Sequence, residues 1–206
     1  IEDAAPCLSQ SARTVGSHQI RTAGTIGGNV ATASPAGDGV CALVALDASV
    51  VLTSHRGQRN VAVRDFATGP KTTVIEKDEF IERIDVPIVN GWQGYSKIGT
   101  RNAMVISVAG AAVVLSPDSQ MRRIALGSVG PTIIAADSAS SFATTAIDWN
   151  TSSVSTDDLD QVVQLVRESA SPINDHRSTA SYRTHAVGVL VKRLIEQGLR
   201  SIKESV

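Results

Sequence analysis

Residues 19–29 read QIRTAGTIGGN. The adjacent glycines in this stretch, Gly27 and Gly28, let a backbone approach a ligand closely and turn its N–H groups toward an anion. The stretch therefore predicts a phosphate-binding loop in the N-terminal part of the chain. From spacing alone, a surface turn that contains two glycines explains the pattern equally well.

Short polar side chains accompany the glycine pair. Thr25 and Asn29 lie next to it, and Ser34 follows in the segment ASPAGD at residues 33–38. Each of these three side chains can offer a hydrogen bond to a ligand without adding bulk. The carboxylate that ends the segment, on Asp38, is expected to hold a ribose hydroxyl.

Outside this stretch, hydrophobic periodicity divides the chain near residues 55 and 170. In the first zone, a helix is expected over residues 8–15, a loop rich in Gly, Ser and Thr over 24–39, and an apolar run over 40–52. The middle zone alternates apolar and polar residues in short runs between turn signals, which is typical of an antiparallel meander. These runs are residues 60–64, 80–88, 93–98, 104–115 and 121–129.

The last zone is predicted to form two helices. A capping box at residues 155–158 begins the first, and Pro172 ends it. The second helix is expected over residues 177–197, with Gly198 ending it. Its inward stripe is Tyr182, Ala186, Val189, Leu190 and Leu194. Before these helices, residues 138–155 are small and polar and are expected to form a connector.

The composition is that of a globular chain with a sizeable core. Of its 206 residues, 42% are hydrophobic and 19% are charged, and the net charge is −1. Because there is no basic surplus, nucleic acid and anionic membrane surfaces are poor candidates for partners. The sequence contains neither a long apolar run nor an export signal, which favours the cytoplasm. Its two cysteines, Cys7 and Cys41, are expected to be small buried side chains rather than zinc or iron–sulfur ligands.

The motif TIGGN at residues 25–29, preceded by QIR and followed by SPAGD, is similar to the flavin-binding segment of the molybdenum hydroxylases. This family includes xanthine dehydrogenase, aerobic carbon monoxide dehydrogenase and nicotine dehydrogenase. Further similar segments follow in the family's order along nearly the whole chain. These segments are residues 65–70, 78–87, 95–97, 109–112 and 171–183. Thr22 replaces an asparagine that is common in the family and keeps a hydrogen-bonding group.

The resemblance implies an α+β fold in two parts. Residues 1–55 would be the second half of an FAD-binding α/β subdomain, and residues 56–206 an antiparallel sheet packed with C-terminal helices. A full flavin subunit of this family carries an upstream subdomain with a second glycine-rich loop, and nothing before Ile1 corresponds to it. The missing N-terminal half of the FAD domain is therefore expected to be a separate piece, or else the protein does not bind FAD tightly.

The resemblance also implies which residues contact FAD. Those that would cradle the pyrophosphate are Thr25, Ile26, Gly27, Gly28 and Asn29, with Ser34 as a further donor. Asp38 would lie near the sugar or adenine, and Ile81 and Lys97 would line the flavin site. Tyr95 would lie close to the isoalloxazine face. The sequence equally allows Tyr95 to pack in the core with its hydroxyl bonded, and Lys97 to be a solvated strand lysine.

For function, the resemblance implies the flavoprotein subunit of an oxidoreductase. Electrons would pass from 2Fe–2S clusters in a small subunit through FAD in this medium subunit to oxygen, NAD, a quinone or a cytochrome, while a large subunit carries the molybdopterin cofactor. No catalytic side chain is expected here, because the redox chemistry belongs to the cofactor. The alternative is a non-catalytic scaffold with an empty or incomplete FAD site. The flavin assignment predicts that Gly28→Val abolishes flavin retention and leaves the fold intact.

The remaining polar residues give weaker candidates. The four histidines are scattered and lack metal-ligand spacing, so no metal site is expected. Asp175 is expected to cap the helix that follows it, and Arg177 to form a structural ion pair. Arg183, Lys192 and Arg193 are expected to form a solvated basic stripe on that helix, which can also meet a partner subunit.

Overall fold

The computed structural model describes residues 1–118 and 121–204. The helices are α1 (Pro6–Arg13), α2 (His18–Ala23), α3 (Ile26–Ala31), α4 (Asp38–Ala45), α5 (Val63–Phe66), α6 (Asp137–Ala146), α7 (Thr156–Ser169) and α8 (Ala180–Glu204). The strands are β1 (Ser49–Ser54), β2 (Gly57–Ala62), β3 (Ala67–Gly69), β4 (Thr72–Thr73), β5 (Phe80–Asp85), β6 (Trp92–Ile98), β7 (Ala109–Ser116), β8 (Met121–Gly127) and β9 (Ile134–Ala135).

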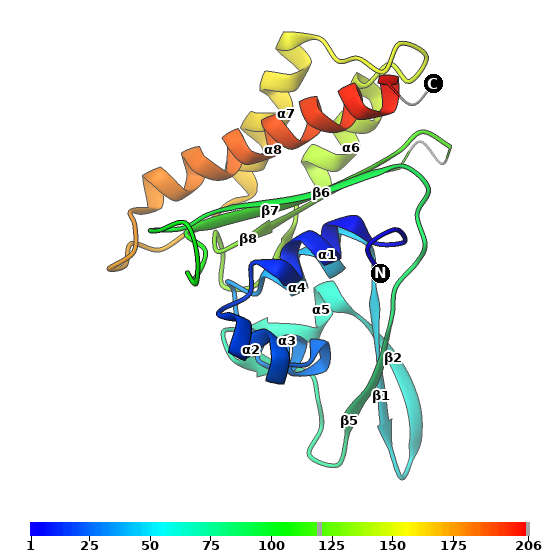
Figure 1. The fold of residues 1–206 in the computed structure, drawn as a ribbon, viewed down its shortest axis with the longest axis vertical. Coiled ribbons are helices and arrows are strands. Elements are labelled where there is room, and N and C mark those ends of the chain that lie inside the picture. Colours follow the sequence, from blue (N-terminus) through cyan, green and yellow to red (C-terminus); the bar gives the residue numbers. More distant parts are fainter. Residues whose placement is uncertain (119–120, 205–206) are drawn as a thin grey trace.

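A four-stranded antiparallel sheet in the order β6–β7–β8–β9 is the central layer of the molecule (Figure 1). Every residue of β7 is buried, because helices cover both faces of the sheet. Val113 and Leu115 point into a core shared with α6, α7 and α8, whereas Ala112 and Val114 point into a second core shared with α1 and α4. Because successive side chains of a strand point to opposite faces, β7 contributes to both cores.

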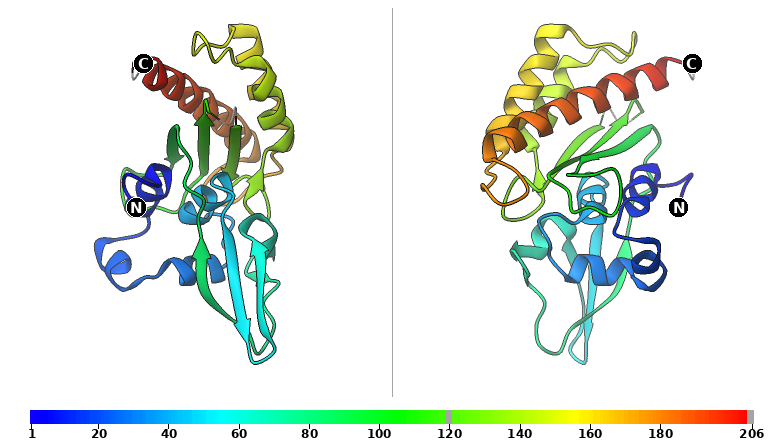
Figure 2. Two further views of the ribbon diagram at one scale, coloured as in Figure 1. Left: turned by 90° about the vertical axis from the view of Figure 1, so that its right-hand side faces the viewer. Right: turned by 60° about the vertical axis from the view of Figure 1, so that its left-hand side comes forward.

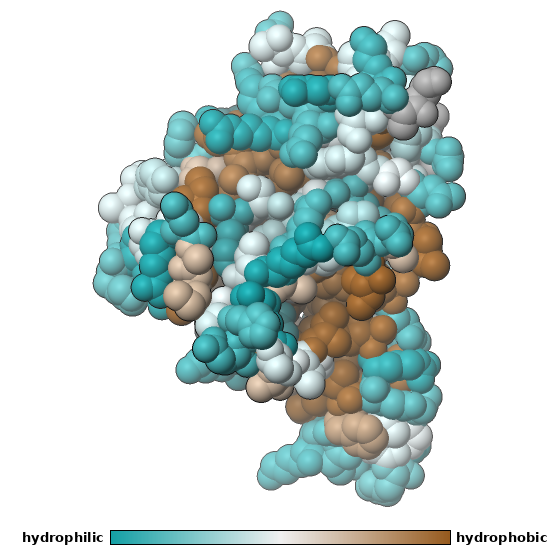
Figure 3. All heavy atoms as spheres, viewed as in Figure 1, coloured by the Kyte–Doolittle hydropathy of each residue, from teal (hydrophilic) through white to brown (hydrophobic). Residues whose placement is uncertain are grey.

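A smaller antiparallel sheet in the order β2–β1–β5 extends away from the central layer (Figure 2). Val50 and Leu52 of β1 are fully buried, and Ile81 and Ile84 of β5 pack beside the same core. The helix α3 contacts β5. Apolar residues gather on the surface beside β1 and β5, whereas α7 and α8 present mainly hydrophilic residues (Figure 3). The division expected near residue 55 falls in the turn between β1 and β2 and stays a prediction.

The predicted antiparallel α+β architecture is confirmed, and so is the capped helix α7. The Ser155 hydroxyl accepts a hydrogen bond from the Asp158 N–H at 3.0 Å, and the apolar stripe that includes Leu159 and Val162 is buried. The next helix, α8, does not end at Gly198 but continues to Glu204. A Cβ on Gly198 would lie 2.6 Å from atoms of Trp92, so this glycine allows close packing of the helix on the sheet.

Two segments that were predicted to be irregular are helical. Residues 24–39 contain α3 and the first two residues of α4, and residues 138–155 contain all of α6 but its first residue. Both segments are rich in small residues, which differ little in hydrophobicity, so the sequence shows no helical periodicity there. In α6, only Ala139 and Ala143 are buried, and this short stripe packs against β8. The strand expected to begin at residue 104 begins at Ala109 instead.

The predicted basic stripe on α8 is wrong at its first residue. Arg183 is 4% exposed and donates hydrogen bonds to the carbonyls of Val108 at 2.8 Å and Ser128 at 3.0 Å. It also donates to Asp175 at 2.7 Å. Tyr182, expected to face inward, is 48% exposed. The rotation of α8 about its axis therefore directs the Arg183 guanidinium toward the sheet and the Tyr182 ring toward solvent.

Asp175 organises the segment before α8 without capping it. Its carboxylate accepts hydrogen bonds from the backbone N–H groups of Arg177 and Ser178, and the predicted ion pair with Arg177 is present at 3.0 Å. The start of α8 is bonded instead by Asn174, whose Oδ1 accepts from the Ala180 N–H at 2.6 Å. The expected cap is thus one residue earlier in the sequence.

Lowering the pH should weaken this segment through Asp175. The backbone N–H of Arg177, then the side chain of Arg183, holds the pKa of Asp175 below its usual value of 3.8. Because the folded-state pKa is lowered, the stabilisation is complete above about pH 5 and is lost progressively as the pH falls further. Thermal unfolding of the wild type and Asp175→Asn from pH 7 to pH 3 should show a steeper acid loss in the wild type. Parallel profiles would contradict this role.

No helix among the described residues is both long and apolar enough to cross a membrane.

Candidate functional site

The predicted phosphate-binding segment begins the short helix α3. The Thr25 backbone is extended, and its hydroxyl accepts a hydrogen bond from the Gly28 N–H at 3.0 Å. The Asn29 N–H donates to the Thr25 carbonyl, also at 3.0 Å. The glycine pair therefore lies in the first helical turn and not in an open loop. Thr25, Gly28 and the half-exposed Ile26 lie at the surface.

The packing of the protein does not require a glycine at position 27. Within the described residues, a Cβ built on Gly27 would meet only the Ile81 side chain, at an ordinary contact distance of 3.9 Å. By contrast, a Cβ on Gly39 would lie 2.8 Å from Asn29 Oδ1, so packing explains that glycine. A glycine inside a helix costs about 0.5–1 kcal/mol relative to alanine. Gly27 thus lowers helix stability with no gain in packing, which fits a backbone approached by a ligand.

Gly28 differs from Gly27 in this respect. A Cβ on Gly28 would lie 3.1 Å from the Thr25 hydroxyl, the group that caps the helix. A side chain there would therefore press on the cap as well as on any ligand. Gly28→Val would therefore disturb the fold as well as the ligand site. The flavin assignment is better tested with Gly27→Val.

Asn29 and Ser34, the two other residues predicted to contact the phosphate, both make contacts within the protein. Asn29 is half-buried, and its Oδ1 has no hydrogen-bond partner within the described part of the chain. The Ser34 hydroxyl accepts a hydrogen bond from the Ala36 N–H at 3.2 Å and so stabilises the turn before α4. The Asn29 Oδ1 thus faces Gly39 of α4, whereas the Ser34 hydroxyl bonds its own backbone segment.

Asp38, Tyr95 and Lys97 come together in a buried polar cluster, which also includes Thr14. Asp38 Oδ1 accepts a hydrogen bond from the Tyr95 hydroxyl at 2.7 Å, and Oδ2 forms an ion pair with Lys97 at 2.5 Å. The Thr14 hydroxyl donates to the same Oδ2 at 3.1 Å. Lys97 also donates to the carbonyls of Thr14 at 3.0 Å and Val105 at 3.2 Å.

This buried cluster changes the interpretation of its three predicted members. Asp38 is 6% exposed and both its oxygens are bonded within the protein, so its geometry does not support the expected contact with a ribose. Lys97 is not a solvated strand lysine, because its side chain is 10% exposed. Tyr95 packs in the core with its hydroxyl bonded, and burial followed by the charge of Asp38 raises its pKa well above 10.0. Their proposed flavin contacts stay predictions.

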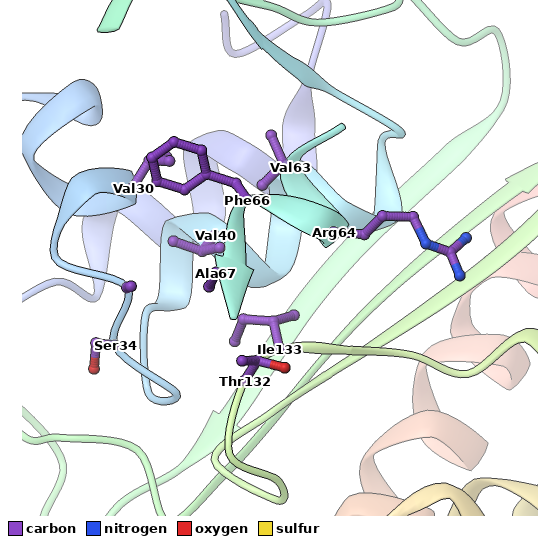
Figure 4. A pocket seen from close by; sticks show the side chains of 10 residues that line it. Val30, Ser34, Val40, Val63, Arg64, Phe66, Ala67, Thr132 and Ile133 are labelled. Carbon is purple, nitrogen blue, oxygen red and sulfur yellow. The ribbon is translucent and has the colours of Figure 1, made fainter. Parts of the chain in front are cut away.

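Two cavities lie near these residues. The first, of about 10 Å³, is lined by apolar side chains such as Val30 and Phe66, with Arg64 pointing away from them (Figure 4). It has room for little more than one water molecule. The second is an open pocket of about 690 Å³ between the α1–α2 segment and the loop that joins β6 to β7. Tyr95 and Lys97 line this larger pocket.

The larger pocket contains functional candidates that the sequence did not indicate. Arg13, His18, Arg21 and Arg101 line it, and they come from segments about 80 residues apart in the chain. Only the tertiary fold brings these segments together. The QIR motif, which includes Arg21, is the one local signal that could have pointed to this pocket.

Metal-ligating residues do not converge in the described ranges 1–118 and 121–204, where no group of three or more His, Cys, Asp or Glu side chains could hold an ion. Cys7 and Cys41 are buried and not joined in a disulfide, as expected. Burial raises the pKa of the Cys7 thiol to about 12. Neither thiol is therefore activated as a nucleophile.

Two protein families match this chain in tandem. Residues 1–89 match the family described as the FAD binding domain in molybdopterin dehydrogenase. Residues 95–197 match the family described as the CO dehydrogenase flavoprotein C-terminal domain. Together the two matches cover nearly the whole chain in the order that the sequence motifs follow.

Individual proteins agree with these family matches. The chain is 29% identical to the glyceraldehyde dehydrogenase medium chain of Sulfolobus acidocaldarius, covering 96% of this chain and 69% of the relative. It is 32% identical to the nicotine 6-hydroxylase medium subunit of Paenarthrobacter nicotinovorans, and the match covers 95% of this chain and 68% of that relative. The structure of reconstituted CO dehydrogenase from Oligotropha carboxidovorans contains a similar chain, with a TM-score of 0.85 and 30% identity over 97% of this chain and 69% of that one. This chain thus spans about two thirds of these relatives, and it belongs to the family of FAD-binding medium subunits of the molybdenum hydroxylases.

Proposed function

We propose that this chain holds FAD and carries electrons through it from an iron–sulfur subunit to an external acceptor. The observation that carries the proposal is Gly27, a helical glycine that neither backbone conformation nor packing requires, within the motif that the family uses for flavin. The relatives of this chain include a carbon monoxide dehydrogenase medium chain and a nicotinate dehydrogenase FAD-subunit.

The residues at the start of α3 fit an FAD pyrophosphate. Gly28 is exposed and Gly27 is half-buried, and the cap on Thr25 holds the first turn in a fixed conformation. The N–H groups of Gly28 and Asn29 are bonded to Thr25, and the remaining peptide N–H groups of this first turn favour a bound anion. The Asn29 amide nitrogen is the group that can donate to a phosphate, and Ile81 adds an apolar contact next to Gly27. We assign these residues, with Ile26, to the pyrophosphate side of the site.

The other predicted residues act on the flavin site by holding its framework. The ion pair of Asp38 with Lys97 joins α4 to β6, and the Tyr95 hydroxyl adds a second bond between the same elements. This cluster fixes the position of α4 relative to the sheet. When FAD is bound, the cofactor itself supplies the electron-transfer chemistry. No side chain of this chain needs to donate or accept a proton for that role.

The proposal includes partners that lie outside this chain. These are a large subunit with the molybdenum cofactor, a small subunit with 2Fe–2S clusters, and the other half of the FAD-binding domain. Substrate and acceptor contacts would depend on these partners and on the flavin surface. The proposed location of the complex is the cytoplasm.

The test is to purify the protein together with the subunits that accompany it, and to identify them by mass spectrometry. An anaerobic reductant for the iron–sulfur subunit is then mixed in, while the flavin and cluster absorbances are followed separately. We expect both absorbances to fall, and an added acceptor to restore them. Loss of cluster absorbance with unchanged flavin absorbance would contradict electron transfer. Partner subunits without any flavin would favour the scaffold role.

A further inference from the structure

We propose that Arg183 of α8 is a positioning residue for the flavin site, because its guanidinium holds together two segments that border that site. The segments are residues 33–38, which follow the glycine pair of α3, and residues 99–107, which join β6 to β7. This inference rests on the proposed function, since it concerns the placement of the same cofactor. Arg183 is not among the residues that line the larger pocket, so it acts through its neighbours.

The first segment that Arg183 holds is the loop between β6 and β7, which lies at the same end of the central sheet as the start of α8 (Figure 1). The Val108 N–H donates to the Ile98 carbonyl at 2.7 Å and closes the loop at its base. Arg183 Nη1 donates to the carbonyl of the same Val108 at 2.8 Å. Residues 101–105 of this loop line the larger pocket together with Tyr95. Arg183 therefore fixes the base of one wall of the pocket.

The second segment that Arg183 holds is the turn before α4. Ser128, directly after β8, donates its backbone N–H to the Pro35 carbonyl at 2.8 Å. The Ser128 carbonyl accepts a hydrogen bond from Arg183 Nη1 at 3.0 Å, and its hydroxyl is bonded to that of Ser107 at 2.6 Å. Arg183 thus reaches the turn through a single residue. We refer to the bonds of Arg183 to the carbonyls of Val108 and Ser128 as the Arg183 clamp.

The residues of this junction are buried and held in one conformation. Arg183 is 4% exposed, Ser107 3% and Ser128 8%, so water cannot replace their lost bonds. The Ser128 backbone has a φ of 64°, which a residue other than glycine keeps only where its surroundings fix it. Arg183 Nη2 donates in addition to Asp175 at 2.7 Å. A planar guanidinium can serve these three acceptors at once, whereas the ammonium of a lysine keeps the charge without the fork.

Other bonds from this loop to the sheet are sparse in the described part of the chain. The guanidinium of Arg101 donates to the carbonyls of Ala103 and Met104, which lie in the loop itself. Lys97 of β6 donates to the Val105 carbonyl at 3.2 Å. Most of the loop is exposed. Loss of the Arg183 clamp should therefore lower the free energy of local opening of the loop.

The test begins with hydrogen exchange in the wild type, Arg183→Gln and Arg183→Lys, each purified with its accompanying subunits. We expect the amides of residues 33–38 and 99–107 to exchange about tenfold faster in Arg183→Gln, because buried carbonyls lose their donor. Arg183→Lys should give an intermediate rate. Ser107→Ala, which removes one hydroxyl of the junction and no charge, should speed exchange in the same two segments.

The bound flavin then reports whether the Arg183 clamp acts on the cofactor. Its visible circular dichroism and midpoint potential should shift in Arg183→Lys and shift further in Arg183→Gln. The affinity for FAD should fall about tenfold in Arg183→Gln. Leu194→Ala is the matched control, because Leu194 is buried in the same helix and packs in the core shared with α6 and α7. It should lower the unfolding midpoint and leave the exchange of both segments and the flavin signals unchanged.

Each contrary result has a distinct meaning. Unchanged exchange in a folded Arg183→Gln protein would overturn the Arg183 clamp, and so would equal changes in Arg183→Gln and Leu194→Ala. Faster exchange with unchanged flavin signals would overturn the positioning role. A flavin-free wild type whose two segments still respond to Arg183→Gln would contradict the proposed function and support the clamp. If Arg183→Gln does not fold, Arg183→Lys and Ser107→Ala carry the comparison.

Discussion

Gly27→Val should remove FAD from the purified protein and leave the fold intact. The Gly27 position has space within the protein, because a Cβ there would lie 3.9 Å from the Ile81 side chain, so packing does not exclude a larger residue. A valine would instead occupy the surface that the pyrophosphate is proposed to approach. The measurement is the ratio of flavin to protein after purification, together with the thermal unfolding midpoint. We expect the ratio to fall to near zero.

Matched substitutions separate ligand contact from helix stability. Gly27→Ala should raise the free energy of unfolding by about 0.5–1 kcal/mol, because alanine favours the helix, while flavin content falls. Ala31→Val adds a similar side chain at an exposed position at the other end of α3 and should retain flavin. Full flavin content in a folded Gly27→Val protein would remove the main support for the site.

Asp38→Asn should lower the free energy of unfolding by about 3–5 kcal/mol, because it leaves a buried ammonium without its carboxylate. The Lys97 side chain is 10% exposed and that of Asp38 is 6% exposed, so water cannot replace the lost partner fully. The Asn amide would also place an N–H group toward Lys97 or Tyr95. Urea unfolding of the variant and the wild type at pH 7 measures the difference.

The coupling between the two charges provides the control. The double variant Asp38→Asn with Lys97→Met should be more stable than Asp38→Asn alone, because no charge is left buried. Asp160→Asn breaks the exposed ion pair with Lys192 and should cost less than about 1 kcal/mol. A loss at Asp38 as small as the loss at Asp160 would show that the buried cluster does not hold α4 on the sheet.

The sequence predicted those elements whose side chains alternate or recur with a clear period. The strands β5, β6 and β8 overlap the expected runs, and α7 begins at its predicted cap on Ser155. The helices α3 and α6 were missed because glycine, serine, threonine and alanine give little hydrophobic contrast. Tyr182 and Arg183 were placed on the wrong faces of α8, because a buried arginine with three partners looks polar in the sequence.

The candidate site was predictable where it is local and not where it depends on tertiary contacts. The TIGGN motif alone indicates the glycine pair of α3, of which Gly28 is exposed and Gly27 half-buried. The bonds of Asp38 to Tyr95 and Lys97 join residues 57 and 59 positions apart, and Thr14 enters the same cluster from the end of α1. Similarly, Arg21 and Arg101 meet across one pocket only after the loop from β6 to β7 folds beside α2. No sequence period encodes these long-range contacts.

The central claim, that this chain is an FAD-holding electron carrier, is tested most directly by the visible absorption spectrum of the protein purified from its own cells with its accompanying subunits. The account predicts flavin bands, and release of FAD in a ratio of about one per copy of this chain after acid denaturation. A preparation that contains the chain and its partners but shows no flavin bands, and stays without them after incubation with FAD, would contradict it.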